Sequence, residues 1–106
     1  MLLVLDTNEY VFGLQVPPKS PSDEILNLIV GHWPHLSIRI PRTIVAEVCR
    51  NLTKAQVRRF YTFINTVAQV DEDHVVPFEM AERYQRMNLK PADAFIAAYT
   101  EWVGAS

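Results

Sequence analysis

The sequence predicts an α/β fold, in which a parallel sheet carries helices on both faces in three α/β/α layers. Three observations favour it: an uninterrupted apolar run at residues 2–5, apolar residues at helical spacing in several later segments, and short strand-like segments between those helices. A strand buried on both faces is apolar throughout, and strands separated by helices form parallel sheets. With 106 residues, of which 49% are hydrophobic and 21% charged, the chain is expected to form a single domain, residues 1–106.

The first half of the chain predicts two strands and one helix. Residues 2–5 form the first strand, which ends at Asp6. After a proline-containing linker, a helix is expected over residues 21–33, with Ser20 as its N-cap and a proline as its first residue. Residues 36–40 alternate apolar and polar side chains, which is typical of a strand.

The second half predicts four helices and a third strand. Thr43 can cap the first of these helices, and Thr53 with Gln56 forms a capping-box pattern that opens the next. An acidic turn at residues 71–73 is expected to lead into the third strand, residues 74–76. The expected helices are residues 43–52, 53–67, 77–87 and 91–103.

Positive charge is concentrated in one part of the chain, although the formal net charge is −2. Six of the ten basic residues lie between positions 39 and 59, where Glu47 is the only acid. A local excess of positive charge can attract a phosphate backbone, and the same residues could equally form a solvated helix face. The candidates for nucleic-acid binding are Arg42, Arg50, Lys54 and Arg58.

The single cysteine, Cys49, bears on the compartment. It cannot form an internal disulfide and suits a reducing environment, so we expect a cytoplasmic protein. Its apolar neighbours in a helix predict a small core residue rather than a nucleophile. The apolar start, residues 1–5, is too short for a membrane span and lacks the basic front of a signal peptide, so no membrane association is expected.

Three acids from distant parts of the chain are expected to meet at one edge of the sheet. Asp6 follows the first strand, Glu47 lies one turn into the helix after the second strand, and Asp93 opens the last helix. Ligands of open parallel sheets bind at the carboxyl ends of the strands. Clustered carboxylates repel one another unless a cation neutralises them, and Mg²⁺ or Mn²⁺ prefers oxygen ligands. Each acid alone also has a structural explanation, as a turn, surface or helix-dipole residue.

Three segments resemble the motifs of PIN domains, and together they span the chain. The first is Leu2-Leu3-Val4-Leu5-Asp6-Thr7-Asn8 followed by Gly13-Leu14, the second is residues 41–48 with Asn51-Leu52, and the third is residues 90–98, in which an Asp opens an alanine-rich helix. The resemblance implies a Rossmann-like α/β/α fold and a Mg²⁺- or Mn²⁺-dependent endoribonuclease that cleaves single-stranded RNA. Many bacterial members are toxins held inactive by a small antitoxin protein.

By this resemblance Asp6, Glu47 and Asp93 would be the catalytic, metal-binding acids, and Thr7 or Asn8 would support them by hydrogen bonding. The resemblance also implies a further strand, ending near a fourth polar ligand, after residue 105, whereas the sequence ends at Ser106. We therefore expect a PIN-like sheet without its last strand or strands. Residues 2–5 would then form an exposed edge that is covered in a homo-oligomer.

Other functions compete with the ribonuclease. The first is a catalytically inactive PIN-like module that binds RNA or a protein partner. A phosphoacceptor receiver domain would need an acidic pair at the first strand and an Asp ending the third. A haloacid-dehalogenase-type phosphatase would need a second Asp where Asn8 stands.

Overall fold

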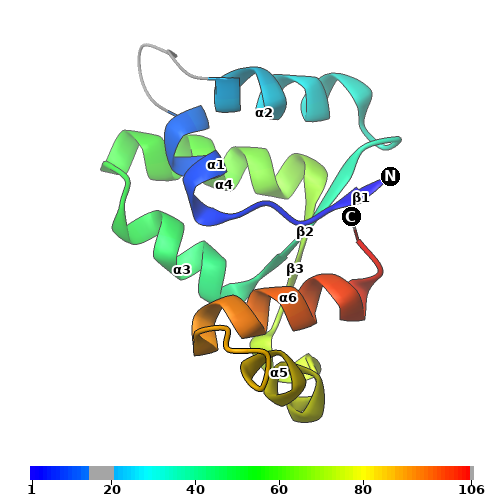
Figure 1. Ribbon diagram of the computed structural model, residues 1–106. Coiled ribbons are helices and arrows are strands. Elements are labelled where there is room, and N and C mark those ends of the chain that lie inside the picture. Colours follow the sequence, from blue (N-terminus) through cyan, green and yellow to red (C-terminus); the bar gives the residue numbers. More distant parts are fainter. Residues whose placement is uncertain (15–20, 106) are drawn as a thin grey trace.

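The protein has the α/β architecture predicted from its sequence. The computed structural model describes residues 1–14 and 21–105, and its three strands form one parallel sheet in the order β1-β2-β3 (Figure 1). The strands are β1 (Leu2–Leu3), β2 (Ser37–Pro41) and β3 (Ala68–Asp71). The helices are α1 (Thr7–Gly13), α2 (Pro21–His32), α3 (Arg42–Arg50), α4 (Lys54–Val67), α5 (Phe78–Gln85) and α6 (Pro91–Val103), with a short 3-10 helix, η1, at Asp73–Val75.

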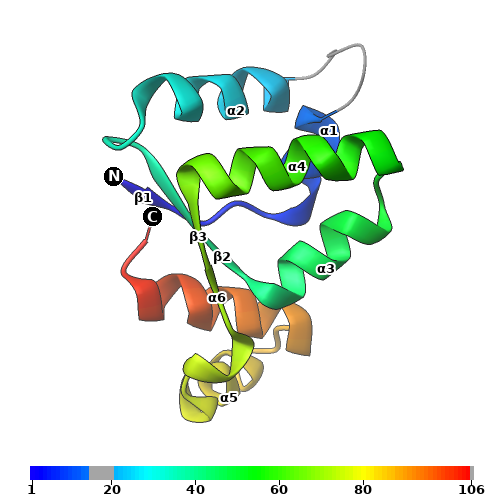
Figure 2. The same ribbon diagram turned by 180° about the vertical axis from the view of Figure 1, so that it is seen from behind.

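The sheet separates two groups of helices, which Figures 1 and 2 show from opposite sides. The helices from α1 to α4 pack on one face, and α5 and α6 pack on the other. Alternation along β2 explains this, because Ile38 and Ile40 point into the first group and Arg39 points toward α6. The residues after Met1 alternate in the same way: Leu3 and Leu5 pack against the first group of helices, and Val4 packs against the second.

The first strand is shorter than predicted. Leu2 pairs with Ser37 and Leu3 with Ile38, and the pairing of β1 ends there. Val4 and Leu5 continue toward α1 as partly buried residues without a ladder partner. Both were expected in the strand because apolar burial and strand pairing give the same sequence signal.

The predicted third strand, residues 74–76, is wrong. The strand is Ala68–Asp71, which pairs with β2 from Ile38 opposite Ala68 to Pro41 opposite Asp71. Asp71 therefore ends a strand, and Glu72 and Asp73 follow it. Val75 and Val76 are apolar because they pack with residues of α6 in a smaller hydrophobic core on the other face of the sheet.

Helix α1 was not predicted. It begins directly after Asp6, whose side chain accepts a hydrogen bond from the backbone N–H of Asn8 at 2.7 Å. An Asp that accepts this bond is a favourable N-cap. Tyr10 and Gly13 are buried in this short helix, which has too few residues to give a clear apolar period.

The other helices agree with the prediction to within two residues at their starts and ends. Thr53 and Gln56 form the capping box of α4, with both reciprocal hydrogen bonds present. Helix α3 begins at Arg42 after Pro41, so Thr43 lies inside it and is not its N-cap. Helix α2 begins at the predicted residue, while the predicted N-cap Ser20 lies outside the described residues.

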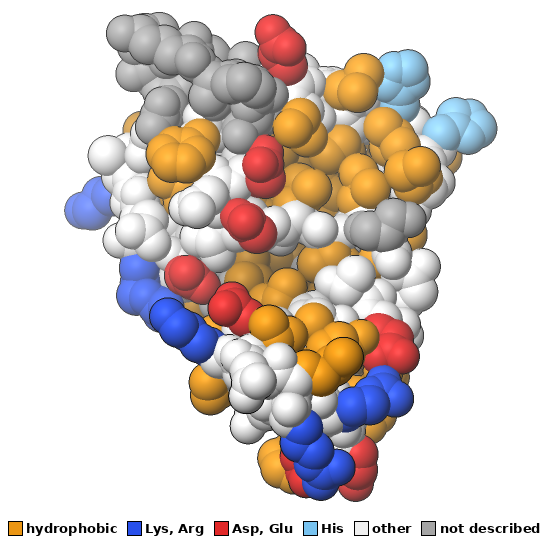
Figure 3. Space-filling view, viewed as in Figure 1, with side chains coloured by type: hydrophobic (Ala, Val, Ile, Leu, Met, Phe, Trp, Pro, Cys, Tyr) orange, Lys and Arg blue, Asp and Glu red, His pale blue; other side chains and the backbone are white. Residues whose placement is uncertain are grey.

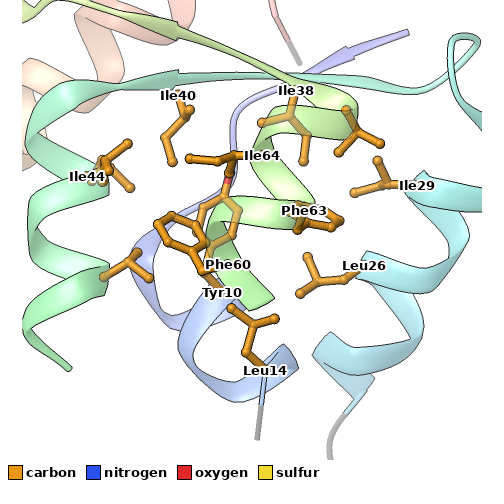
Figure 4. Packing of buried hydrophobic residues seen from close by; sticks show 13 residues of the cluster. Tyr10, Leu14, Leu26, Ile29, Ile38, Ile40, Ile44, Phe60, Phe63 and Ile64 are labelled. Carbon is orange, nitrogen blue, oxygen red and sulfur yellow. The ribbon is translucent and has the colours of Figure 1, made fainter. Parts of the chain in front are cut away.

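The larger hydrophobic core lies between β2 and the first group of helices (Figure 4). Tyr10 and Phe60 form its centre, in an edge-to-face contact with ring centroids 5.4 Å apart. Cys49 is half-buried against this core, as predicted, and its Sγ donates to the Tyr61 hydroxyl oxygen at 3.6 Å. None of the helices in the described ranges is long and apolar enough to cross a membrane.

Candidate functional site at the carboxyl edge of the sheet

The carboxyl ends of the strands carry several acidic residues. In the view of Figure 3, acidic side chains form a diagonal band over α1, α3 and the beginning of α6, with basic side chains beside its lower end. Because the three strands are parallel, Asp6, Pro41 and Asp71 all follow or end strands at this edge. The edge is therefore the place where the topology gathers these acids.

Glu47 and Asp73 line one pocket together. It has a volume of about 340 Å³ and lies between α3, η1 and the first turn of α6, where Pro91 and Ala92 complete it. Glu47 is exposed and points from the middle of α3. Phe95 and the residues beside it form the apolar wall of the pocket. The pocket is thus lined by Glu47, a predicted site residue, and by Asp73, which was not predicted.

Asp73 also fixes the start of α3. Its Oδ1 accepts a hydrogen bond from the backbone N–H of Thr43 at 3.1 Å. Pro41 is the N-cap of α3 and has no capping side chain, so Asp73 supplies that acceptor from η1, which follows β3. The signal that could have identified it is an acid directly after a strand, which was hidden by the wrong position of the third strand.

Asp6 and Asp93 lie on neighbouring elements but do not line the pocket. Asp6 is exposed at the start of α1, a helix that packs against α3, and one of its oxygens caps α1. Asp93 is exposed in the first turn of α6, one residue after Ala92. Among the residues that the structure describes, no three His, Cys, Asp or Glu side chains are grouped so that they could hold a metal ion.

The two predicted supporting residues differ in what they do. Asn8 supports Asp6, but through its backbone N–H rather than its side chain. Thr7 is the first residue of α1. Neither side chain has a described bond to a carboxylate of the site, so their supporting role stays a prediction.

The four predicted basic residues are divided between the helices α3 and α4. Arg42 pairs with Glu72, Nη2 to Oε1 2.8 Å, and this hydrogen bond holds the pKa of the Glu72 carboxyl below its usual value. Arg50 ends α3 and Lys54 begins α4, so the turn between the helices separates them. Arg58 is exposed further along α4 and lines a groove facing α2.

A buried polar network on the opposite face of the sheet holds α6 in place. Asp71 accepts two hydrogen bonds from Arg39 and one from the Tyr99 hydroxyl, at 2.5 Å. Hydrogen bonding to Arg39 lowers the pKa of Asp71, while burial and the bond to Asp71 raise the pKa of Tyr99. Since Tyr99 belongs to the helix that carries Asp93, the network ties this helix to the strand ends.

Comparisons with known proteins do not identify the chain: neither a family model, nor a curated protein, nor a solved structure matches it. Its fold and the side chains at the carboxyl edge are therefore the basis for assigning a function.

Proposed function

We propose that the protein is a PIN-like, Mg²⁺- or Mn²⁺-dependent endoribonuclease acting on single-stranded RNA. The observation that carries the proposal is the pocket shared by Glu47 and Asp73 at the carboxyl edge of a parallel sheet, bounded by the first turn of α6. The motifs that resemble those of PIN domains also imply an acidic metal site at this edge. It further suggests a toxin that a small antitoxin protein holds inactive in the cytoplasm.

The donor chemistry at this edge suits a hard cation. Glu47, Asp73, Asp6 and Asp93 offer only carboxylate oxygens, which Mg²⁺ and Mn²⁺ prefer over the nitrogen and sulfur ligands of zinc. Mg²⁺ is commonly held by one or two carboxylates and keeps several waters. Glu47 and Asp73 would hold the ion, and Asp6 and Asp93 lie at the starts of the neighbouring helices α1 and α6. When bound, the ion would lower the pKa of a water and offset charge on the phosphate.

The side chains around the pocket have separate tasks in this proposal. Asp73 orients Glu47 by fixing the first turn of α3 through Thr43. Arg42 lies at the same turn and would bind a phosphate of the RNA when it leaves Glu72. An exposed ion pair of this kind contributes little to stability, so Arg42 can exchange Glu72 for a phosphate at a small cost in free energy.

The test is cleavage of a fluorescent single-stranded RNA by pure protein with and without Mn²⁺ or Mg²⁺. Wild-type protein should cleave only with the metal. Asp6→Asn, Glu47→Gln and Asp93→Asn should each lower the rate at least about a hundredfold, as expected for groups that act together. Glu79→Gln, which neutralises an exposed acid on α5, is the matched control and should cleave like wild type.

Equal cleavage by Asp6→Asn and wild type would point to a contaminating nuclease and sink the enzyme proposal. Retained folding is checked separately by circular dichroism. These substitutions replace exposed side chains, so loss of activity with an unchanged thermal midpoint isolates the chemistry from stability.

The second candidate is an inactive PIN-like module that binds RNA or a protein partner. One observation favours it: among the side chains that the structure describes, no group of three that could bind a metal is formed. This candidate predicts metal-independent RNA binding without cleavage. Binding measured by fluorescence anisotropy, together with intact RNA after long incubation with Mn²⁺, would select it over the enzyme.

A further inference from the structure

A second pocket, away from the carboxyl edge, lies between α2 and α4 at the end of α1. It has a volume of about 410 Å³. Its floor consists of Leu14, Leu26 and Phe63, which belong to the larger core. Figure 4 shows these three side chains between α1, α2 and α4. The pocket is thus an opening onto apolar core surface.

Apolar character continues to the rim on the α2 side. Val30 lines the pocket and is 47% exposed. On the α4 side, Thr62 and Thr66 also line it, but their hydroxyls donate to backbone carbonyls of α4 at 3.0 and 2.8 Å. These hydroxyl protons are engaged within the helix, so the pocket presents an apolar centre rather than a set of free donors.

Two arginines line the pocket, and none of the described residues that line it with them is acidic. They are Arg58 and Arg59, and α4, which carries both, contains no acidic residue. Arg59 donates from Nη1 to the carbonyl of Leu14 at 3.3 Å, which joins α4 to the end of α1. Arg58 has no ion-pair partner among the described side chains. An anion is the complement of this charge.

We propose that this pocket binds a small amphipathic anion, such as a medium-chain carboxylate, with its acid at Arg58 and Arg59 and its chain on the Leu14–Leu26–Phe63 floor. The volume lies within the range of small-molecule sites, roughly 300–1,000 Å³, and such sites combine an apolar lining with few polar anchors. The site is separate from the acidic pocket between α3 and α6, and it does not depend on the proposed ribonuclease activity.

The probes are decanoate, acetate and decanol, titrated below the micelle-forming concentration and followed by calorimetry and by amide NMR shifts. Decanoate should bind saturably and shift amides of residues 13–14, 26–30 and 58–66. Acetate has the charge alone and decanol the chain alone, so each should bind at least about tenfold more weakly than decanoate. Equal binding of acetate, or shifts confined to other residues, would overturn the proposal.

Two variants and a control locate the site. Arg58→Gln should weaken decanoate binding about tenfold, and Val30→Trp should abolish it by filling the pocket from its exposed rim. Arg86→Gln removes an exposed arginine after α5 and should bind decanoate like wild type. Thermal midpoints verify that each variant is folded. Equal loss in Arg58→Gln and Arg86→Gln, or binding of an acidic amphipathic peptide but not decanoate, would reject the small-anion site.

Discussion

Arg39 on β2 and Asp71 at the end of β3 form a two-point ion pair beneath α6. Nε of Arg39 lies 2.8 Å from Oδ2 of Asp71, and Nη2 lies 2.9 Å from Oδ1. The Tyr99 hydroxyl donates to the same Oδ2, and Gln69 donates to Oδ1 at 3.4 Å. Asp71 is only 9% exposed, so these bonds replace the water that a buried carboxylate has lost. Two strands and one helix are joined by a single carboxylate.

Replacing Asp71 with Asn should destabilise the protein strongly. The variant leaves the Arg39 guanidinium partly buried without its counter-charge, and we expect the free energy of unfolding to fall by about 2–3 kcal/mol. Urea unfolding at pH 7 measures the loss. Glu72→Gln is the matched control, because it breaks a pair with Arg42 that is open to solvent, and its effect should be much smaller. Equal effects of the two variants would refute the structural role of Asp71.

The stabilisation by Asp71 should depend on pH in a defined direction. Hydrogen bonding to Arg39 lowers the pKa of Asp71 in the folded protein, while the unfolded chain has an ordinary value of about 3.9. The contribution is therefore fully present above the unfolded pKa and is lost as the pH falls toward the folded one. The difference in unfolding free energy between wild type and Asp71→Asn should be constant above about pH 5 and shrink below about pH 4. A difference that grows on acidification would contradict this assignment.

Removing the hydroxyl groups of two buried tyrosines should have different effects on the stability of the protein. The Tyr10 hydroxyl is buried and finds no hydrogen-bond partner in the described residues, whereas that of Tyr99 donates to Asp71. Tyr10→Phe removes an unsatisfied polar group and should leave stability unchanged or raise it by up to about 1 kcal/mol. Tyr99→Phe removes a charge-assisted bond and should lower it by about 1–2 kcal/mol. Thermal unfolding of both variants compares them, and a destabilised Tyr10→Phe would reveal a partner for that hydroxyl.

Local signals in the sequence predicted much of the fold. The capping box at Thr53, the proline that opens α6 and the alternation along β2 are each encoded within a few residues, so they could be recognised without tertiary information. The third strand could not, because its identity depends on the long-range partner of Asp71. Without Arg39 in view, an acid in a strand resembles the start of a turn.

The candidate site was predicted only in part for a similar reason. The sequence indicates which residues follow strands, and it identified Glu47 correctly as a residue of the carboxyl edge. It does not indicate which side chains share one pocket, since that depends on the crossing of α3 and α6. Asp73 therefore joins Glu47, while Asp6 and Asp93 stand on the adjoining helices.

The exposed edge of β1 should mediate self-association. Within the described residues β1 pairs with β2 alone, so the other side of Leu2–Leu3 presents backbone groups without a strand partner. Figure 3 shows apolar side chains gathered over α2 and the neighbouring β1, and the adjoining Met1 and Trp33 are exposed. An apolar strand edge can pair with its own copy about a two-fold axis, because the side chains of the strand carry no charge that would repel the second copy.

We therefore expect wild-type protein to form a dimer or higher oligomer at micromolar concentration, measured by light scattering after size exclusion. Leu2→Lys would bring like charges together across the paired edges and should shift the protein toward the monomer. Met87→Lys adds the same charge at an exposed site after α5 and should leave the oligomer intact. A wild-type monomer at micromolar concentration, or equal dissociation by both variants, would show that the β1 edge is not the interface.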